Sequence, residues 1–128
     1  MSNFGKNIRD FTYISDVVKG ILAALNFDTN QSELINLGSQ NPINLTQLVH
    51  LMGEELLRKN APTKIHLVPM QKGDVPLTYA NITKAKQLLH WEPEIGIKQG
   101  LELFLEWYQT HNASVYMPMT SLRTARTL

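Results

Sequence analysis

The apolar positions near the start of the chain predict a strand followed directly by a helix. Residues 9–14, RDFTYI, are rich in β-branched and aromatic side chains, which favour strands. Residues 15–25, SDVVKGILAAL, carry a helical pattern that Ser15 or Asp16 can cap. The apolar positions of this segment are Val17, Val18, Ile21, Leu22, Ala24 and Leu25. Because they spread wider than one amphipathic stripe, we expect the helix to be covered on more than one side.

Two further apolar runs predict short strands. Residues 33–38, ELINLG, form a compact apolar run that glycine ends, and residues 64–69, KIHLVP, form one that proline closes. Proline suits the end of a strand or an edge strand because it has no backbone N–H to donate. We therefore expect two more strands, the second of them at its end or at an edge of a sheet.

Three more segments have helical spacing. Residues 44–60, 83–90 and 96–111 repeat apolar side chains every three or four positions. Candidate N-caps are Asn44 or Thr46 for the first of these segments and Asn81 or Thr83 for the second. The last segment carries one apolar face, made of Ile97, Leu101, Phe104, Leu105 and Tyr108. We expect this face to be a core surface.

The order of these elements indicates an α/β fold with short strands and about four helices. Residues 1–111 are expected to form a single α/β domain. Residues 112–128 contain two arginines, no acidic residue and no clear periodicity. We therefore expect this tail to be flexible or to be ordered by a partner.

Composition narrows the classes of function. The 128 residues are 43% hydrophobic and 18% charged, and 12 basic against 11 acidic side chains leave a net charge of +1. This balance offers no broad electrostatic surface for nucleic acid or for an acidic membrane, so neither is expected as a partner. The chain has no cysteine, which excludes disulfides, thiolate catalysis and cysteine-based metal sites.

Targeting signals and metal-ligand patterns add little. No apolar run approaches the roughly 20 residues of a membrane-spanning helix, and the N-terminus lacks the apolar core of a signal peptide, so a cytoplasmic protein is expected. His50 and Glu54 share a helical face at spacing i,i+4, but no third ligand has recognisable spacing. We expect a surface hydrogen bond between them and no metal site.

Four blocks of the chain carry a family resemblance. They are RDFTYISDVVKGI, INLGSQNPINL, PMQKGDVPLTYANITKAKQLL and WEPEIGIKQGLELFLEWY, in this order. Together they resemble the C-terminal part of the extended short-chain dehydrogenase/reductase family, in particular nucleotide-sugar 4-epimerases acting on UDP-glucuronate or UDP-galactose. The resemblance spans roughly residues 5–109 and implies a substrate-binding part of such an epimerase.

The resemblance implies three residues that bind a nucleotide sugar. The position of Arg9 reaches the diphosphate in that family, and a planar fork of donors suits a diphosphate. The positions of Gln71 and Asp74 contact the ribose side, on a loop at residues 71–79 that closes over the nucleotide. Relatives acting on galactose usually have arginine at the position of Gln71, so the resemblance favours a UDP-uronate ligand.

Each of these residues also has a plain structural interpretation. Arg9 could pair with a nearby acid such as Asp10 or Asp16. Asp74 follows Gly73, and aspartate in a turn commonly bonds a neighbouring backbone amide. Gln71 could be a solvated amide. The sequence leaves these alternatives open.

The chemistry of the family needs motifs that this sequence does not contain. Its bound nicotinamide cofactor, NAD, sits on a glycine-rich turn, but neither GxGxxG nor GxxGxxG occurs here. Its general base is a tyrosine with lysine four residues later, and none of Tyr13, Tyr79, Tyr108 and Tyr116 has that neighbour. We therefore expect no cofactor in this chain and no catalysis by the chain alone.

Three functions from different classes are compatible with this sequence. The first is a non-catalytic domain that retains UDP-sugar binding. The second is an interaction module, a homodimer or a partner-protein complex, built on the apolar surface at Val17, Val18, Ile21, Leu22 and Leu25 that the cofactor domain covers in the family. The third is half of a split NAD-dependent epimerase that a separate cofactor domain completes.

Overall fold

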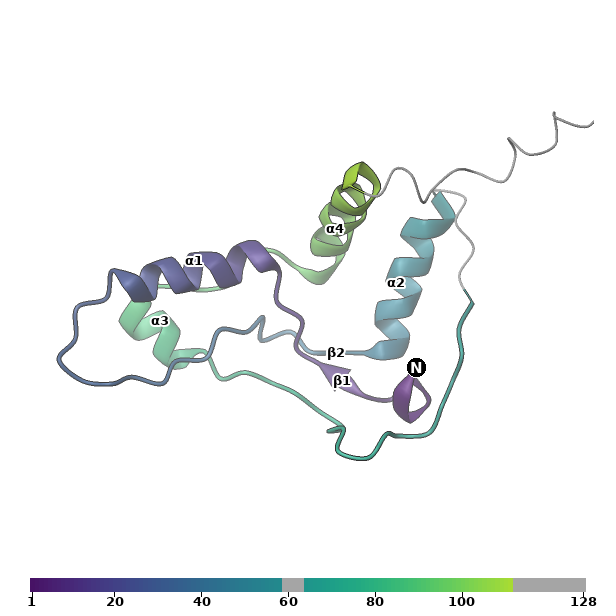
Figure 1. Cartoon of the computed structure of the whole chain (residues 1–128), viewed down its shortest axis with the longest axis horizontal. Coiled ribbons are helices and arrows are strands. Elements are labelled where there is room, and N and C mark those ends of the chain that lie inside the picture. The colour runs from purple at the N-terminus through teal and green to yellow at the C-terminus, as the bar shows by residue number, and fades with distance from the viewer. Residues whose placement is uncertain (59–63, 112–128) are drawn as a thin grey trace, which may run out of the picture.

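The computed structural model describes residues 1–58 and 64–111, so the predicted tail at 112–128 lies outside the described residues. Within these described residues, four α-helices and a two-stranded sheet confirm the α/β class and the predicted number of helices (Figure 1). The elements in chain order are η1 (Ser2–Gly5), β1 (Ile8–Arg9), α1 (Ile14–Leu25), β2 (Ile43–Asn44), α2 (Leu45–Arg58), α3 (Thr83–Leu89) and α4 (Ile97–His111).

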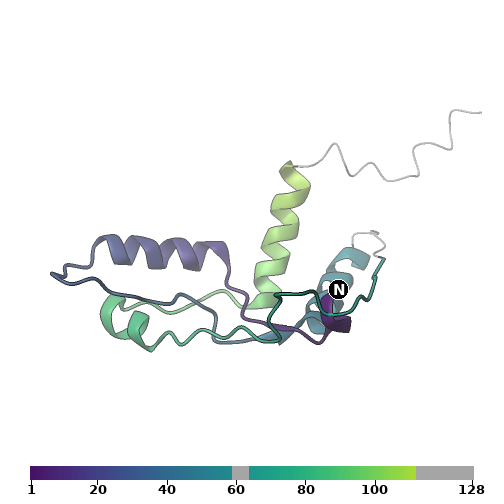
Figure 2. The ribbon, with the colours of Figure 1, turned by 60° about the horizontal axis from the view of Figure 1, so that its bottom comes forward.

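The helices are spread along an elongated chain. In Figures 1 and 2, α1 and α3 lie at one end, α2 and the N-terminal turn η1 lie at the other, and α4 stands out from the layer between them. Within the described ranges, no helix is long and apolar enough to cross a lipid bilayer.

β1 lies between two other segments. It pairs antiparallel with β2, and Ile8 faces Asn44 while Arg9 faces Ile43. On its other side, Ile8 forms a parallel bridge with Leu77, because the Ile8 N–H donates to the Pro76 carbonyl at 2.8 Å and the Thr78 N–H donates to the Ile8 carbonyl at 3.1 Å. This arrangement brings the loop at residues 70–76 beside Arg9.

The predicted strands are largely wrong. Only Arg9 of residues 9–14 belongs to a strand, and residues 33–38 and 64–69 form none. Strand propensity reports how well side chains fit a half-buried sheet, and a strand also needs a neighbour with which to form a ladder. Residues 64–69 are exposed throughout, and the described chain offers residues 33–38 no ladder. The short strand β2 was not predicted.

The helix boundaries agree better, although the N-cap residues differ in part. Asn44 caps α2 as expected: its Oδ1 accepts from the Gln47 N–H at 2.7 Å, and the Gln47 side chain accepts from the Asn44 N–H at 3.1 Å, which forms a reciprocal capping box. The prediction for α1 is wrong, because Tyr13 is the N-cap residue and no side chain caps that end.

Asp16 is used for tertiary contacts instead of capping. It is fully buried, and its Oδ2 accepts from the N–H groups of Glu94 at 3.1 Å and Ile95 at 2.9 Å. Its backbone carbonyl accepts from the Trp91 indole N–H at 2.8 Å. Asp16 therefore fastens α1 to the segment that joins α3 to α4.

The core lies mainly between α1 and α3. Ile82, Ala85, Leu89 and Trp91 are buried there. The partly buried side chains that pack against them are Ala23, Phe27, Ile35, Leu37 and Ala80. On α4, Leu101 and Leu105 are buried as expected, whereas Phe104 is 42% exposed. The prediction for Phe104 is wrong because the described chain covers only part of that helix face.

We expect Gly38→Ala to unfold the chain more easily, with a loss of about 2 kcal/mol in the free energy of unfolding. A Cβ at Gly38 would lie 2.2 Å from the Ala80 Cβ and 2.9 Å from the Asp10 Oδ2. The Ala80 methyl group is attached to the backbone and cannot rotate away, so the backbone must shift. Urea unfolding followed by circular dichroism measures this loss.

Gly53→Ala is the matched control for this substitution. Gly53 lies inside α2, and a Cβ there would meet nothing within 4 Å. We expect this substitution to stabilise the chain by about 0.5–1 kcal/mol, because alanine favours a helix over glycine. Equal effects of the two substitutions would contradict the close approach at Gly38.

Candidate functional site

Arg9 and Asp74 meet at the edge of the small sheet. The Arg9 Nη2 lies 2.5 Å from the Asp74 Oδ1, and the two side chains are 20% and 25% exposed. The Arg9 Nη1 also donates to its neighbouring Ile8 carbonyl at 2.8 Å. Arg9 therefore pairs with Asp74 and not with Asp10 or Asp16, the acids that its structural interpretation offered.

The Asp74 carboxylate accepts four hydrogen bonds. Oδ1 accepts from Arg9 and from the Val75 N–H at 3.0 Å. Oδ2 accepts from the Ser2 hydroxyl at 3.0 Å and from the Asn7 side-chain amide at 2.6 Å. The turn interpretation of Asp74 is confirmed, because its carboxylate bonds the Val75 N–H of its own turn, and the carboxylate also forms an ion pair with Arg9.

The loop around Asp74 is a tight turn. The Asp74 N–H donates to the Gln71 carbonyl at 3.2 Å, and Gly73 between them has φ of +86°, which glycine adopts at little cost. The Gln71 N–H donates to the Ser2 Oγ at 3.3 Å. The Gln71 side chain is exposed, and among the described residues it has no hydrogen-bond partner. The turn thus leaves the Gln71 side-chain amide exposed to solvent, three residues before Asp74.

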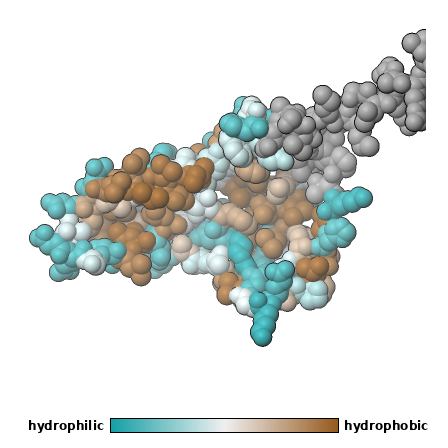
Figure 3. All heavy atoms as spheres, in the orientation of Figure 1, coloured by the Kyte–Doolittle hydropathy of each residue, from teal (hydrophilic) through white to brown (hydrophobic). Residues whose placement is uncertain are grey.

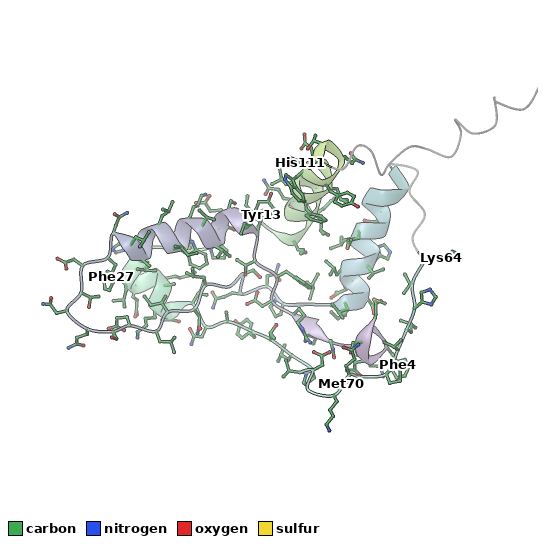
Figure 4. The ribbon with its side chains drawn as sticks, in the orientation of Figure 1. Phe4, Tyr13, Phe27, Lys64, Met70 and His111 are labelled. Atoms are coloured by element: carbon green, nitrogen blue, oxygen red, sulfur yellow. The ribbon has the colours of Figure 1, made fainter. Side chains whose placement is uncertain are left out.

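The N-terminal turn holds this loop from the other side. The Phe4 N–H donates to the Val68 carbonyl at 3.0 Å, and the Val68 N–H donates to the Met1 carbonyl at 2.9 Å. In Figure 4, the labelled Phe4 and Met70 mark the two segments that meet here. Sequence analysis missed Ser2 and Asn7 as parts of the site, because they lie 72 and 67 residues from Asp74 and belong to no recognised motif.

Electrostatics keep Asp74 ionised. Desolvation raises the pKa of Asp74, but the Ser2 hydroxyl, the Arg9 guanidinium and the Val75 and Asn7 donors outweigh it and hold the pKa below its usual range. An ionised Asp74 is therefore available to orient Arg9 at any pH near neutrality.

Asp10 anchors the neighbouring segments behind Arg9. Its carboxylate accepts from the N–H groups of Ser39 at 3.0 Å, Gln40 at 3.3 Å and Ala80 at 3.0 Å, and also from the Ser39 hydroxyl. Desolvation raises the pKa of Asp10, but these hydrogen bonds outweigh it and lower the pKa from its usual range. A hollow of about 260 Å³ lies next to this junction and is lined in part by Asp10, Thr78 and Tyr79.

The lowered pKa of Asp10 predicts a loss of stability in acid. The stabilisation is complete above the ordinary aspartate pKa of about 4, and it is lost as the pH falls through the lower folded-state pKa. We expect Asp10→Asn to be less stable than the wild type at pH 7 and to lose less on acidification, whereas exposed Asp28→Asn should follow the wild type. Thermal unfolding from pH 7 to pH 2 measures this. Parallel curves for the wild type and Asp10→Asn would contradict it.

The described residues contain no metal cluster. His50 and Glu54 lie 3.4 Å apart on α2, as expected from their spacing. No group of three or more histidine, cysteine, aspartate or glutamate side chains that could hold a metal ion occurs within residues 1–58 and 64–111.

Comparison with known proteins identifies the family to which this chain belongs. The family model described as GDP-mannose 4,6 dehydratase matches residues 3–104. A UDP-glucuronate 4-epimerase from Thermodesulfobacterium geofontis is 43% identical over 104 residues, which are 80% of this chain and 31% of that protein.

Solved structures give the same result. One is UDP-glucuronic acid 4-epimerase from Bacillus cereus in complex with UDP-glucuronic acid and NAD, which superposes with a TM-score of 0.74 at 26% identity. The superposed part is 86% of this chain and 35% of the epimerase chain. Another is UDP-glucose 4-epimerase from Thermotoga maritima with UDP-glucose, which superposes with a TM-score of 0.75 at 30% identity. The superposed part is 87% of this chain and 34% of the epimerase chain.

The likeness extends over part of these proteins only. The chain spans 26–31% of the length of the first curated relatives that it matches. Within that part, the family model covers the Arg9 and Asp74 site and most of the described residues. These findings confirm the resemblance to nucleotide-sugar epimerases, and the chain belongs to the GDP-mannose 4,6 dehydratase family.

Proposed function

We propose that this chain binds the nucleotide end of a UDP-sugar, with Arg9 on the diphosphate and with Gln71 and Asp74 on the ribose side. The observation that carries the proposal is the pairing of Arg9 with Asp74 across 65 residues of sequence, in a turn whose Gln71 is exposed. Structural relatives solved with UDP-glucuronic acid and with UDP-glucose support it.

The donor capacity of Arg9 suits a diphosphate. A guanidinium carries five N–H donors, and the described residues account for one bond from each of its two terminal nitrogens. The remaining donors can face an anion in a bidentate geometry, which is the strongest mode of phosphate recognition by a side chain. Arg9 is partly exposed, so a ligand can reach it without opening the core.

The substrate class that we propose is a UDP-uronate such as UDP-glucuronate. By the family resemblance, galactose-specific relatives usually carry arginine at the position of Gln71, whereas relatives acting on UDP-uronates resemble this chain more closely there. An amide and a carboxylate can both bond a ribose diol. A ribose hydroxyl would take the place of the Ser2 hydroxyl on Asp74, because four donors already surround that carboxylate.

The described residues do not fit NAD, the cofactor of the family. A dinucleotide pyrophosphate needs a glycine-rich turn at the N-terminus of a helix. The helix that follows β1 begins after the bulky segment at residues 11–13, and its first turn contains the acidic Asp16. We therefore propose a binding role and no catalysis by this chain alone. In a split enzyme, a separate chain would have to supply the cofactor domain.

Calorimetry with fragments of the ligand tests the proposed binding. We expect UDP and UDP-glucuronate to bind with similar affinity, because the diphosphate and ribose carry most of the contacts. Uridine and glucuronate alone should bind far more weakly. No heat of binding for UDP or UDP-glucuronate at millimolar concentration would overturn the proposal.

A second candidate function is protein association through α1. Its exposed apolar face, Ile14, Val18, Ile21, Leu22 and Leu25, is 45–77% exposed residue by residue, and Figure 3 shows apolar surface gathered over this helix. Val17, which the sequence placed in the same surface, is half-buried. Exposed apolar patches of this kind usually mark interaction sites.

Sedimentation across a dilution series tests the second candidate. A mass that rises from one chain toward two with concentration would support a homodimer. A monomeric mass at all concentrations would exclude self-association. The second candidate function would then require a different partner protein.

A further inference from the structure

Asn7 is a fully buried polar residue whose side chain bonds directly to Asp74 of the candidate site. It is 0% exposed. Its amide nitrogen donates to the Asp74 Oδ2 at 2.6 Å, and its amide oxygen accepts from the Asn3 side chain at 2.8 Å. Its backbone carbonyl accepts from the Leu45 N–H at 2.9 Å, which fixes it to the start of α2. Asn7 thus links the N-terminal turn, α2 and the loop of Asp74.

The bond from Asn7 restricts how the Asp74 carboxylate can turn. Asn7 and Ser2 hold Oδ2, so Oδ1 is left to face Arg9 and the Val75 N–H. Asn7 is the more rigid of the two Oδ2 donors, because it is buried and held at its own oxygen, whereas Ser2 is half-buried and its hydroxyl can rotate. Removing Asn7 frees the carboxylate to rotate away from Arg9.

We infer that Asn7 is a positioning residue of the proposed nucleotide-sugar site: it holds the Asp74 carboxylate so that Arg9 is kept oriented at the edge of the sheet. This inference rests on the proposed function. Arginine has many rotamers, and a ligand that must first order the side chain binds less tightly than one that meets it already oriented. Among the described residues, Arg9 is the one charged side chain in contact with Asp74.

The test compares Asn7→Ala with Asn26→Ala. Asn26 is exposed, and its amide donates one bond to the Leu22 carbonyl at the end of α1, far from the site in sequence. We expect Asn7→Ala to weaken UDP binding about tenfold, because the ligand must then order the Arg9 side chain on binding. Asn26→Ala should leave the affinity unchanged. Calorimetry measures both, and circular dichroism checks that both variants are folded.

A double-mutant cycle separates positioning from a general loss of structure. If Asn7 acts through Asp74, Asn7→Ala has no further effect on UDP affinity in an Asp74→Ala background. A tenfold loss that persists in that background would overturn the inference. If Asn7→Ala does not fold, Asn3→Ala takes its place: it removes the donor that holds the Asn7 side-chain oxygen, and its smaller loss of affinity should likewise vanish in the Asp74→Ala background.

A measurement without ligand distinguishes the inference from the proposed function. The Asp74 carboxyl carbon is titrated by NMR in the wild type, Asn7→Ala and Asn26→Ala. We expect an upward shift of the Asp74 midpoint in Asn7→Ala only, since a donor to the ionised form is lost. An unchanged midpoint would overturn the inference even where UDP binds. A shifted midpoint together with no UDP binding by the wild type would refute the proposed function. Asn7 would then still hold the Asp74 carboxylate, but not for a nucleotide sugar.

Discussion

Replacing Arg9 with alanine should weaken the binding of UDP and of UDP-glucuronate about a hundredfold, which corresponds to about 2.7 kcal/mol. The substitution removes a charge-assisted fork of donors from the proposed diphosphate site. It also leaves the Asp74 carboxylate beside the ligand without its cation, and like charges repel. Titration calorimetry of the wild type and the variant at low and moderate salt measures the change.

Two further variants make this experiment specific. Arg9→Lys keeps the positive charge but loses the planar fork, so we expect a loss between those of the wild type and Arg9→Ala. Lys6→Ala removes an exposed cation from the same N-terminal segment and should change the affinity little. Equal losses for Lys6→Ala and Arg9→Ala would show nonspecific attraction of an anion and would contradict a site built on Arg9.

Asp16→Ala should produce the largest loss of stability among the single substitutions considered, about 3 kcal/mol in the free energy of unfolding. The buried carboxylate accepts from the N–H groups of Glu94 and Ile95, and both donors lose this partner in the variant. Without these two hydrogen bonds, α1 is held less firmly to the segment before α4. Urea unfolding followed by fluorescence in a Trp107→Phe background measures the loss of stability, because Trp91 is then the one tryptophan and its indole bonds the Asp16 carbonyl.

The control for Asp16 is Asp28→Ala. Asp28 is exposed just after α1, so its removal changes the charge by the same amount without breaking a buried contact. We expect less than about 0.5 kcal/mol of change for this variant. A loss below 1 kcal/mol for Asp16→Ala would mean that the junction between α1 and α4 does not depend on this carboxylate.

The helices could be predicted from the sequence because their signals are local. Asn44 and Gln47 form their capping box within one turn, and Leu101 and Leu105 are buried at the expected spacing. Strands depend on partners that are distant in sequence. Ile8 pairs with Asn44 on one side and with Leu77 on the other, and no local sequence pattern predicts either partner.

The site shows the same division. The family resemblance identified Arg9, Gln71 and Asp74 as candidates, but the residues alone left Arg9 free to pair with Asp10 or Asp16. The fold decides the pairing, because the bridge between Ile8 and Leu77 carries the loop to Arg9. Ser2 and Asn7 could not be found from the sequence. Their role depends on hydrogen bonds to Asp74, which is distant in sequence and is brought to them by the fold.

Acidic side chains near the site were the hardest to interpret. Asp10 and Asp16 were considered only as surface partners of Arg9 or, for Asp16, as a helix cap. In the structure, each bonds backbone N–H groups of remote segments, at residues 39, 40 and 80 for Asp10 and at residues 94 and 95 for Asp16. A carboxylate with several backbone donors can replace a missing sheet ladder, and short polar signals of this kind have no periodicity to detect.

A residue-resolved NMR titration of the chain with UDP-glucuronate tests the central claim most directly, with UDP alone and glucuronate alone as references. The proposed function predicts saturable shifts that cluster at Arg9 and at residues 71–79, that appear with UDP as well as with UDP-glucuronate, and that are absent with glucuronate. No shifts at millimolar ligand, or shifts confined to the exposed apolar face of α1, would contradict a nucleotide-sugar site at Arg9 and Asp74.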